Sequence, residues 1–279
     1  MAKISVIITC YNREEFISNA IESVLSSEFK DFELIIVDDT SHDKSWEIIN
    51  KYSKDDSRIK AYRNEANLGD YRNRNYSVTL CSSDLIKFVD SDDEIYPHSL
   101  TVFYDSFLQF PNAGLYVSSK YPELLNKKFP ILLSPKETFE IHFLQYGILD
   151  VGPLSVMFNK KNLLMAGSFS GLRYVGDTEV FLKIAARTST VLLNGSLVFW
   201  RQHEGQEIKS EALVFDRERI SLKIYKEVLL SDNSPLNNRI SKKILKHKKR
   251  ELIISVIKKS IKLKKIISGL NVLIKVIRD

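Results

Sequence analysis

The stretch Leu85–Tyr96, LIKFVDSDDEIY, decides the fold because an apolar run of strand length ends in three carboxylates, Asp90, Asp92 and Asp93. A short apolar run indicates a buried strand, and acids at its carboxyl end indicate a ligand site. Two acids one residue apart can bind a hard divalent cation such as Mg²⁺ or Mn²⁺, which usually accompanies a phosphate. The alternative is an acidic turn in which Ser91 or Asp93 caps the next helix.

Strand and helix patterns alternate through the first 110 residues. Strands are expected over 3–9, 32–39, 59–63 and 85–90. The first helix is expected to open with a capping box of Asn12 and Glu15, the second to be capped by Ser41 or Asp43, and the third to cover 72–79. Units of about thirty residues of this kind predict an α/β fold with a largely parallel sheet and right-handed crossovers.

Polar side chains follow three of these strands, and we expect them to meet at one edge of the sheet. A tyrosine at such an edge can stack on a base, and a carboxylate can accept from a base N–H or a ribose hydroxyl. The alternatives are an ordinary surface aromatic for Tyr11 and helix capping, together with Ser41, for Asp39. The three clusters are Thr9, Tyr11 and Asn12; Asp38 and Asp39; and Asp90 and Asp92.

Composition describes an ordinary globular chain with an uneven charge. The 279 residues are 44% hydrophobic, which is enough for a full core in one or two domains. The net charge of +6 divides into +12 over residues 239–279 and −6 over residues 1–238. The basic character therefore belongs to the tail.

Cysteine usage and hydropathy suggest a cytoplasmic location. Cys10 and Cys81 lie in apolar surroundings and are interpreted as reduced core residues, which favours a reducing compartment. No signal peptide precedes the first strand, and the longest uncharged windows fall short of the ~20 residues that a spanning helix needs. We expect a protein that is cytoplasmic or lies on a membrane without crossing it.

Three stretches in order, which contain four linked motifs, resemble the family 2 glycosyltransferases, inverting enzymes of the GT-A fold. They are VIITCYNREEFISNAIESVLSSEFKDFELIIVDDTSHDKS, NEANLGDYRNRN and KFVDSDDEIYP, and they cover roughly the first 110 residues. The resemblance implies a GT-A fold, here followed by a helical basic tail. It also implies a nucleotide-sugar donor, with a UDP-sugar as the default, and Mn²⁺ or Mg²⁺ as the cofactor.

The resemblance assigns roles to matching positions only. Thr9 and Tyr11 would lie beside the base and Asp39 at the base or ribose, while the Asp-x-Asp motif corresponds to Asp90 and Asp92. Asp93 is close enough to compete for the metal. The family's Asn-x-Gly segment and its Arg-Asn pair correspond to Asn67, Gly69, Arg74 and Asn75, with Arg74 at the nucleotide.

This chain departs from the family pattern just before the Arg-Asn pair. The family usually has a small residue there, whereas this chain has Asn73. The three residues before it, Asp70, Tyr71 and Arg72, are also bulkier than is typical. The choice of base and sugar is therefore open.

Further motifs of the family match the second half of the chain. The segment LRYVGDTEVFLKIAAR is an amphipathic helix, and the resemblance selects Asp177, rather than Glu179, as the catalytic base. The alternative for Asp177 is an N-cap that reaches Val180. The segment VFWRQHEGQ matches an Arg-x-His pattern. This implies Arg201 at the diphosphate and His203 as a metal ligand or as a hydrogen-bond donor to phosphate.

We predict three regions: a nucleotide-sugar-binding half over 1–110, an acceptor-binding half of the same domain over 111–208, and a helical extension over 209–279. In the extension, an apolar stripe on each helix alternates with lysines and suits an anionic membrane surface, where a lipid-linked acceptor would lie. The alternative is a face that packs on the body or a partner. Nucleic acid is not expected, because the tail has no aromatic residue. The predicted stripe is Ile253, Ile257, Ile261, Ile266, Leu270, Leu273 and Ile277.

The leading interpretation is an inverting glycosyltransferase acting on a cell-surface glycan or lipid-linked acceptor, located on the inner face of the plasma membrane. One alternative is a sugar-phosphate nucleotidylyltransferase, which would need a Gly-rich basic loop where this chain has Cys10-Tyr11-Asn12. The other is a non-catalytic nucleotide-sugar-binding relative. The presence of both Asp92 and Asp177 argues against it.

Overall fold

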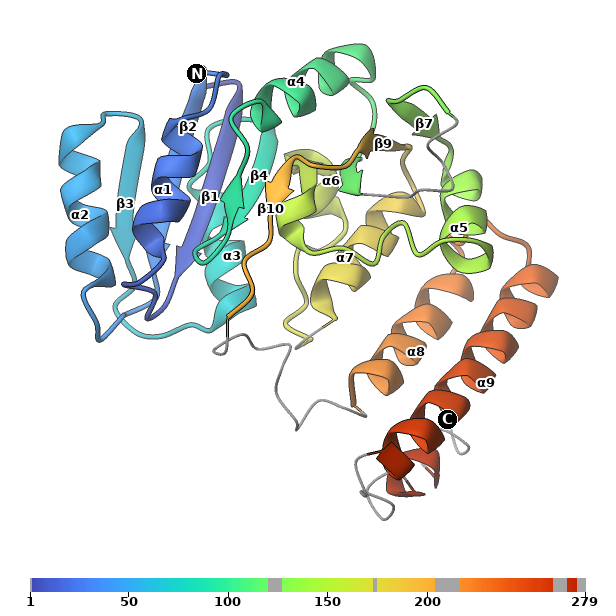
Figure 1. Ribbon diagram of the computed structural model, residues 1–279. Coiled ribbons are helices and arrows are strands. Elements are labelled where there is room, and N and C mark those ends of the chain that lie inside the picture. The colour runs from blue at the N-terminus through green and yellow to red at the C-terminus, as the bar shows by residue number, and fades with distance from the viewer. Residues whose placement is uncertain (1, 120–126, 173–174, 204–215, 263–269, 275–279) are drawn as a thin grey trace.

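The structure is a computed structural model that describes residues 2–119, 127–172, 175–203, 216–262 and 270–274 (Figure 1). Within these ranges a mixed α/β fold is built on one large sheet flanked by helices, with a pair of C-terminal helices beside it. The predicted α/β class with a helical C-terminal region is confirmed.

The central sheet has eight strands in the order β3-β2-β1-β4-β8-β6-β9-β7 among the described residues. β1 pairs in parallel with β2 and β4, β2 with β3, and β6 with β9, whereas the other three pairings are antiparallel. The antiparallel β4–β8 pairing joins the two predicted halves into one sheet, and the boundary near residue 110 stays a prediction. The strands are β1 Ile4–Cys10, β2 Phe32–Asp38, β3 Ile59–Arg63, β4 Leu85–Asp90, β6 Leu115–Ser119, β7 Ile131–Leu133, β8 Val156–Asn159 and β9 Thr190–Asn194.

Helices cover both faces of the sheet because the central strands are apolar on both sides. In β1, Ile4, Val6 and Ile8 pack with α1, α2 and α4, while Ile7 packs into a core that includes α3, α5, α6 and α7. The bounds are α1 Ile17–Leu25, α2 Ser45–Asp55, α3 Asp70–Thr79, α4 Ser99–Gln109, α5 Pro135–Leu144, α6 Lys160–Met165 and α7 Gly176–Ala185. Cys10 and Cys81 are buried free thiols, as predicted for core residues.

The predicted capping box of α1 and the predicted cap of α2 by Ser41 are wrong, whereas Asp43, the other predicted cap of α2, accepts a 2.9 Å hydrogen bond from the N–H of Ser45, the first residue of that helix. α1 begins only at Ile17, and its N-cap residue makes no side-chain cap; Asn12 instead accepts a 2.8 Å hydrogen bond from the backbone N–H of His42. Ser41 accepts from the backbone N–H of Asn12 at 2.9 Å and does not cap α2. The polar side chains after β1 and β2 therefore join two loops, because both strands end at the same edge and leave loop N–H groups to be paired.

The acidic turn after β4 does not cap the next helix. α4 begins at Ser99 with His98 at its N-cap and no side-chain cap, so the alternative role for Ser91 and Asp93 is wrong. Between the turn and α4, β5 (Glu94–Ile95) pairs in antiparallel fashion with β10 (Val198–Phe199). This pairing brings the residues after β10 next to the Asp-x-Asp motif, more than a hundred positions earlier in the chain.

The C-terminal helices α8 (Asp216–Leu229) and α9 (Asn238–Lys262) lie side by side (Figure 1). Of the predicted apolar stripe, Ile257, Ile261 and Leu270 are exposed, whereas Leu252 and Val256, which were not part of it, are buried, and the membrane contact of the stripe stays a prediction. Ile266 and Ile277 lie outside the described residues. Among the described helices, none has the length and apolar character needed to cross a bilayer.

Candidate active site

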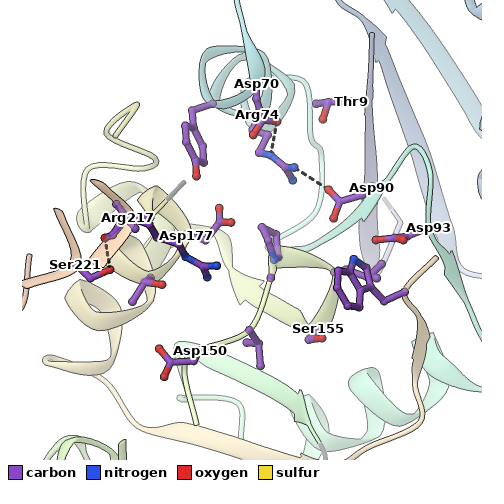
Figure 2. Close-up of a pocket in the computed structure, with 18 of the residues that line it drawn as sticks. Thr9, Asp70, Arg74, Asp90, Asp93, Asp150, Ser155, Asp177, Arg217 and Ser221 are labelled. Atoms are coloured by element: carbon purple, nitrogen blue, oxygen red, sulfur yellow. Dashed lines mark hydrogen bonds and ion pairs between the residues drawn. The ribbon is translucent and has the colours of Figure 1, made fainter. Parts of the chain in front are cut away.

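A single cavity of about 1550 Å³ opens at the carboxyl edge of β1, β2 and β4, as predicted for the ligand site (Figure 2). It continues past the start of α7 to the helices α8 and α9. Ten of the predicted site residues line it: Thr9, Tyr11, Asp39, Asn67, Gly69, Arg74, Asp90, Asp92, Asp93 and Asp177.

Asp39 holds the loop that carries the Asn-x-Gly segment. Its side chain accepts hydrogen bonds from the backbone N–H groups of Leu68 and Gly69 at 2.8 and 2.9 Å and from the amide of Asn64 at 2.7 Å. Asn67 in turn donates to the backbone carbonyl of Asp39 at 3.0 Å. The alternative of helix capping by Asp39 is wrong, because this carboxylate fixes a loop that lines the cavity.

Arg74 connects α3 with the end of β4. Its guanidinium forms ion pairs with Asp70 at 2.8 Å and with Asp90 at 2.7 Å, and the side chain is almost fully buried. These two carboxylates offset the cost of burying the cation and keep the pKa of Arg74 high. Arg74 therefore holds Asp90 in place at the sheet edge (Figure 2). Asn75, its partner in the predicted pair, instead binds the backbone of Phe169.

Asp92 lies between two basic side chains from distant parts of the chain. Its Oδ2 is 3.2 Å from Nε of Arg13 and 3.0 Å from Nε2 of His203. The β5–β10 pairing brings His203 to this position, and its ring lies against the ring of Phe16. Sequence reasoning placed Asp92 and His203 together but missed Arg13, whose signal was a basic residue two positions beyond Tyr11.

Asp93 faces inward and binds the backbone. Only 3% of its surface is exposed, and its Oδ1 accepts from the N–H of Arg201 at 2.8 Å. Burial raises the pKa of Asp93 to about 7, and the neighbouring charge of Asp90 adds to the rise. The Arg201 guanidinium pairs with Glu94 and donates to the carbonyl of Asp92 at 3.1 Å, so Arg201 braces the turn.

The acidic side chains of the turn do not form a preorganised metal-binding site among the described residues. Across the described part of the chain, no three His, Cys, Asp or Glu side chains cluster as a metal site would need. Asp92, which lines the cavity, and His203, which is not among the lining residues, nevertheless form an oxygen-nitrogen pair. Two protein ligands of this kind fit Mg²⁺ or Mn²⁺, which commonly take further oxygens from substrate phosphates and water.

Asp177 lies in the first turn of α7 and faces the cavity (Figure 2). The alternative of an N-cap is wrong, because Val175 occupies that position and no side chain caps the helix. Its Oδ1 is buried without a hydrogen-bond partner among the described residues. Burial raises the pKa of Asp177 to about 7, although the positive charges of Arg74 and Arg217 oppose the rise.

Glu179, the other acid of this segment, differs from Asp177. It is 5% exposed, pairs with Lys183 at 2.5 Å and accepts a hydrogen bond from Ser170. It does not line the cavity. The neighbour Gly176 packs against Tyr71, whose ring would meet any added Cβ at 2.9 Å. The unusual tyrosine before the Arg-Asn pair thus supports the start of α7.

Sequence reasoning missed several residues that line the cavity. Trp200 is 52% exposed at the end of β10, beside the predicted Arg-x-His motif, and this large exposed aromatic was a usable signal. Asp150, Arg217 and Lys248 had no such signal, because only the packing of α8 and α9 brings them to the cavity.

Known proteins resemble this chain over part of their length. The chain is 35% identical over 115 residues to the GalNAc(5)-diNAcBac-PP-undecaprenol beta-1,3-glucosyltransferase of Campylobacter jejuni, covering 41% of this chain and 36% of that protein. It is 41% identical over 93 residues to the Escherichia coli UDP-Glc:alpha-D-GlcNAc-diphosphoundecaprenol beta-1,3-glucosyltransferase WfaP, covering 33% and 36% of the two chains. The chain thus spans little more than a third of the length of these relatives.

Solved structures share the fold across most of the chain. Staphylococcus aureus TarS (residues 1–349), in complex with UDP-GlcNAc, superposes with a TM-score of 0.71 at 22% identity, covering 87% of this chain and 70% of that one. The mannosyltransferase PcManGT of Pyrobaculum calidifontis, in complex with GDP-Man and Mn²⁺, gives 0.66 at 14% identity and covers 98% and 73%. The chain has the GT-A fold of these structures.

The family of this chain follows from a match to a family model that covers more than the motifs at the sheet edge. The model of the family described as "Glycosyl transferase family 2" matches residues 5–163, which is more than half of the chain. The matched range contains the loop held by Asp39 and the Asp-x-Asp turn. This chain therefore belongs to glycosyl transferase family 2.

Proposed function

We propose that the protein is an inverting glycosyltransferase that moves a sugar from a nucleotide-sugar to a hydroxyl of a glycan or lipid-linked acceptor. The observation that carries the proposal is one cavity with two different carboxylate sites: Asp90 and Asp92 at the sheet edge, and Asp177 at the start of α7. A transfer needs these two functions within one molecule's length of each other, one at the leaving group and one at the attacking hydroxyl.

Asp177 is the proposed general base. A carboxyl group with a pKa near 7 is basic enough to accept a proton from an acceptor hydroxyl near neutral pH. Its Oδ1, which has no partner among the described residues, is the atom that would take the proton as the acceptor oxygen attacks the anomeric carbon. A single base opposite the leaving group gives one displacement and therefore inversion.

The donor end is proposed to bind a UDP-sugar. Tyr11 is 42% exposed and can stack on the base, and the loop held by Asp39 offers polar groups to the base and ribose. The name of WfaP includes UDP-Glc, and the structure of TarS contains UDP-GlcNAc. Both favour UDP as the nucleotide of the donor of this chain.

Asp92 and His203 are the residues proposed to hold a divalent cation. When bound, Mg²⁺ or Mn²⁺ would balance the negative charge that gathers on the departing diphosphate. Asp93 is less suited as a ligand because it is buried and bonded to the backbone of Arg201. Arg13, which contacts Asp92 from the open side of the turn, is the better candidate for a diphosphate contact than Arg201.

The acceptor and the location also remain proposals. The two curated relatives described above carry undecaprenol-linked diphosphates in their descriptions, which favours a lipid-linked acceptor. Exposed Ile254, Ile257 and Ile261 on α9, within a region of net charge +12, suit an anionic membrane surface on the cytoplasmic side. Co-sedimentation with phosphatidylglycerol vesicles should exceed that with phosphatidylcholine vesicles, and equal binding to both would contradict an electrostatic contribution.

The test of the proposed function is nucleotide release from a panel of nucleotide-sugars, with and without Mn²⁺ or Mg²⁺. We expect cation-dependent release from one donor that is lost in Asp92→Asn and Asp177→Asn, while Asp177→Asn still binds UDP. If no donor turns over, titration with UDP and Mn²⁺ separates two explanations. Binding without turnover means that hydrolysis requires the acceptor, and failure to bind UDP contradicts the donor assignment.

A further inference from the structure

The cavity is larger than one substrate requires. Its volume of about 1550 Å³ exceeds the ~300–1,000 Å³ of an ordinary small-molecule site. The nucleotide end, at the edge of β1 and β4, takes up one part of it. The other part lies beyond Asp177, between the segment 150–155 and the helices α8 and α9, and we call it the far end (Figure 2).

The far end is lined mainly by positive charge. Four cations from α8 and α9 face it, namely Arg217, Lys248, Lys259 and Lys262, and the acids there are Asp150 and Glu251. Lys248 pairs with Glu251 at 3.0 Å and keeps 28% of its side chain exposed. Arg217 forms no salt bridge with any carboxylate that the structure describes, and it is exposed to the cavity.

The charges of Arg217, on α8, and Lys248, on α9, both affect the pKa of Asp150. Burial raises the pKa of Asp150, and the charges of Lys248 and Arg217 both oppose that rise. Arg217 has the same effect on Asp177. Both cations line the cavity on the side of the proposed catalytic base, so an anion bound in the far end would lie in the field of both.

We propose that Arg217 and Lys248 form an anion subsite at the far end that binds a phosphate group of the acceptor. The proposal rests on the proposed function, since it takes the far end to be the acceptor's. Arginine suits phosphate because its planar guanidinium donates two parallel hydrogen bonds, and lysine adds a point charge. A neutral glycan has no charge for these two cations to pair with, whereas a phosphate does. The phosphate can belong to a lipid diphosphate or to a polymer of polyol phosphates.

Binding of two phosphates to the full-length protein tests the proposal and separates these sources. Octyl phosphate, below its micellar concentration, stands for a lipid phosphate, and glycerol 3-phosphate stands for a polymer unit. Each is titrated calorimetrically into protein with and without saturating UDP and Mg²⁺. We expect at least one to bind with UDP present, with affinity reduced about tenfold in Arg217→Gln and further in Arg217→Gln/Lys248→Gln, because each removes a charge-assisted contact.

Matched variants on exposed positions of α9 serve as controls. Arg250→Gln and Lys243→Gln remove the same charges away from the cavity and should leave phosphate binding unchanged. Octyl glucoside, which has no phosphate, should bind all variants alike. Equal loss in the control variants, or no phosphate binding to protein that does bind UDP, overturns the subsite. Phosphate binding that depends on Arg217 in a protein that fails to bind UDP would retain the subsite and contradict the donor site instead.

Discussion

The two ends of the cavity are built in different ways. The nucleotide end uses the ends of β1, β2 and β4, so most of its residues lie within the first 93 positions, and hydrogen bonds such as those of Asp39 fix its loops. The β5–β10 pairing adds Trp200 and His203 to this end. The far end is assembled from residues 150–155, 217–225 and 248–262, which meet only when helices pack. The comparison teaches that a sheet edge fixes its loops through hydrogen bonds to the backbone, whereas the helix wall contributes side chains that are brought together only by helix packing.

The largest effect is expected where the two ends meet, at Asp177. Asp177→Asn keeps the size of the side chain and removes the base, so kcat should fall by about 10²–10⁴ with UDP affinity unchanged. Steady-state kinetics and UDP titration measure the two quantities. Asp105→Asn, on the exposed surface of α4, is the control and should be silent. A fully active Asp177→Asn would move the base elsewhere.

The next effect concerns the acids at the nucleotide end. Asp92→Asn should lower activity roughly a hundredfold and abolish the response to added Mn²⁺, because it removes a proposed ligand. Asp93→Asn should cost much less, since Asp93 binds the Arg201 N–H through an oxygen that asparagine retains. Activity is measured in chelator-treated protein as Mn²⁺ is added back. Equal losses in both variants would mean that the two acids act as a unit.

The pH dependence of kcat should report the pKa of Asp177, which burial raises. With the pKa of Asp177 raised to about 7, kcat should rise with pH up to that value and fall about tenfold per pH unit below it. A pH–rate profile at saturating donor measures this limb. Any residual activity of Asp177→Asn should lack it, and a profile flat from pH 5 to 8 would contradict the assignment.

The ionised, buried carboxylate of Asp177 should also lower the free energy of unfolding above about pH 7. A carboxyl whose folded pKa is raised stabilises the fold below its unfolded pKa near 4, and this contribution is lost as pH rises through about 7. Asp177→Asn should therefore be more stable than the wild type by about 2 kcal/mol at pH 8, with the gain shrinking towards pH 5. Urea unfolding at both pH values measures it. A destabilised variant at pH 8 would mean that the carboxylate is paired in solution.

The smallest effect compares one glycine from each end. Gly69 has a φ of +80°, which disfavours any residue with a Cβ, whereas Gly152 has a φ of −84° and open space around a Cβ. Gly69→Ala should lower stability by about 1 kcal/mol, and Gly152→Ala should change it by less than about 0.5 kcal/mol. Thermal unfolding measures both. A larger cost at Gly152 would show that the far end is the more constrained of the two.

Sequence reasoning worked where local pattern and strand order carry the information. It placed Asp39, Asp90 and Asp92 at one edge, because parallel strands end together, and Asp177, which the family resemblance selected as the base, lines the same cavity while its role stays a proposal. It failed on helix caps, since Asn12 and Ser41 bind neighbouring loops that a one-dimensional pattern does not reveal.

Taken alone, the sequence determined the alternation of strands and helices, the acidic edge of the sheet and the basic tail, because periodicity and composition are local properties. Tertiary structure alone decided that Arg13 and His203 meet at Asp92, and that Arg217 and Lys248 face the cavity. Each of these contacts joins residues far apart in the chain, or on separate helices. Their meeting depends on how strands pair and helices pack, and a pattern read along one segment contains no record of that.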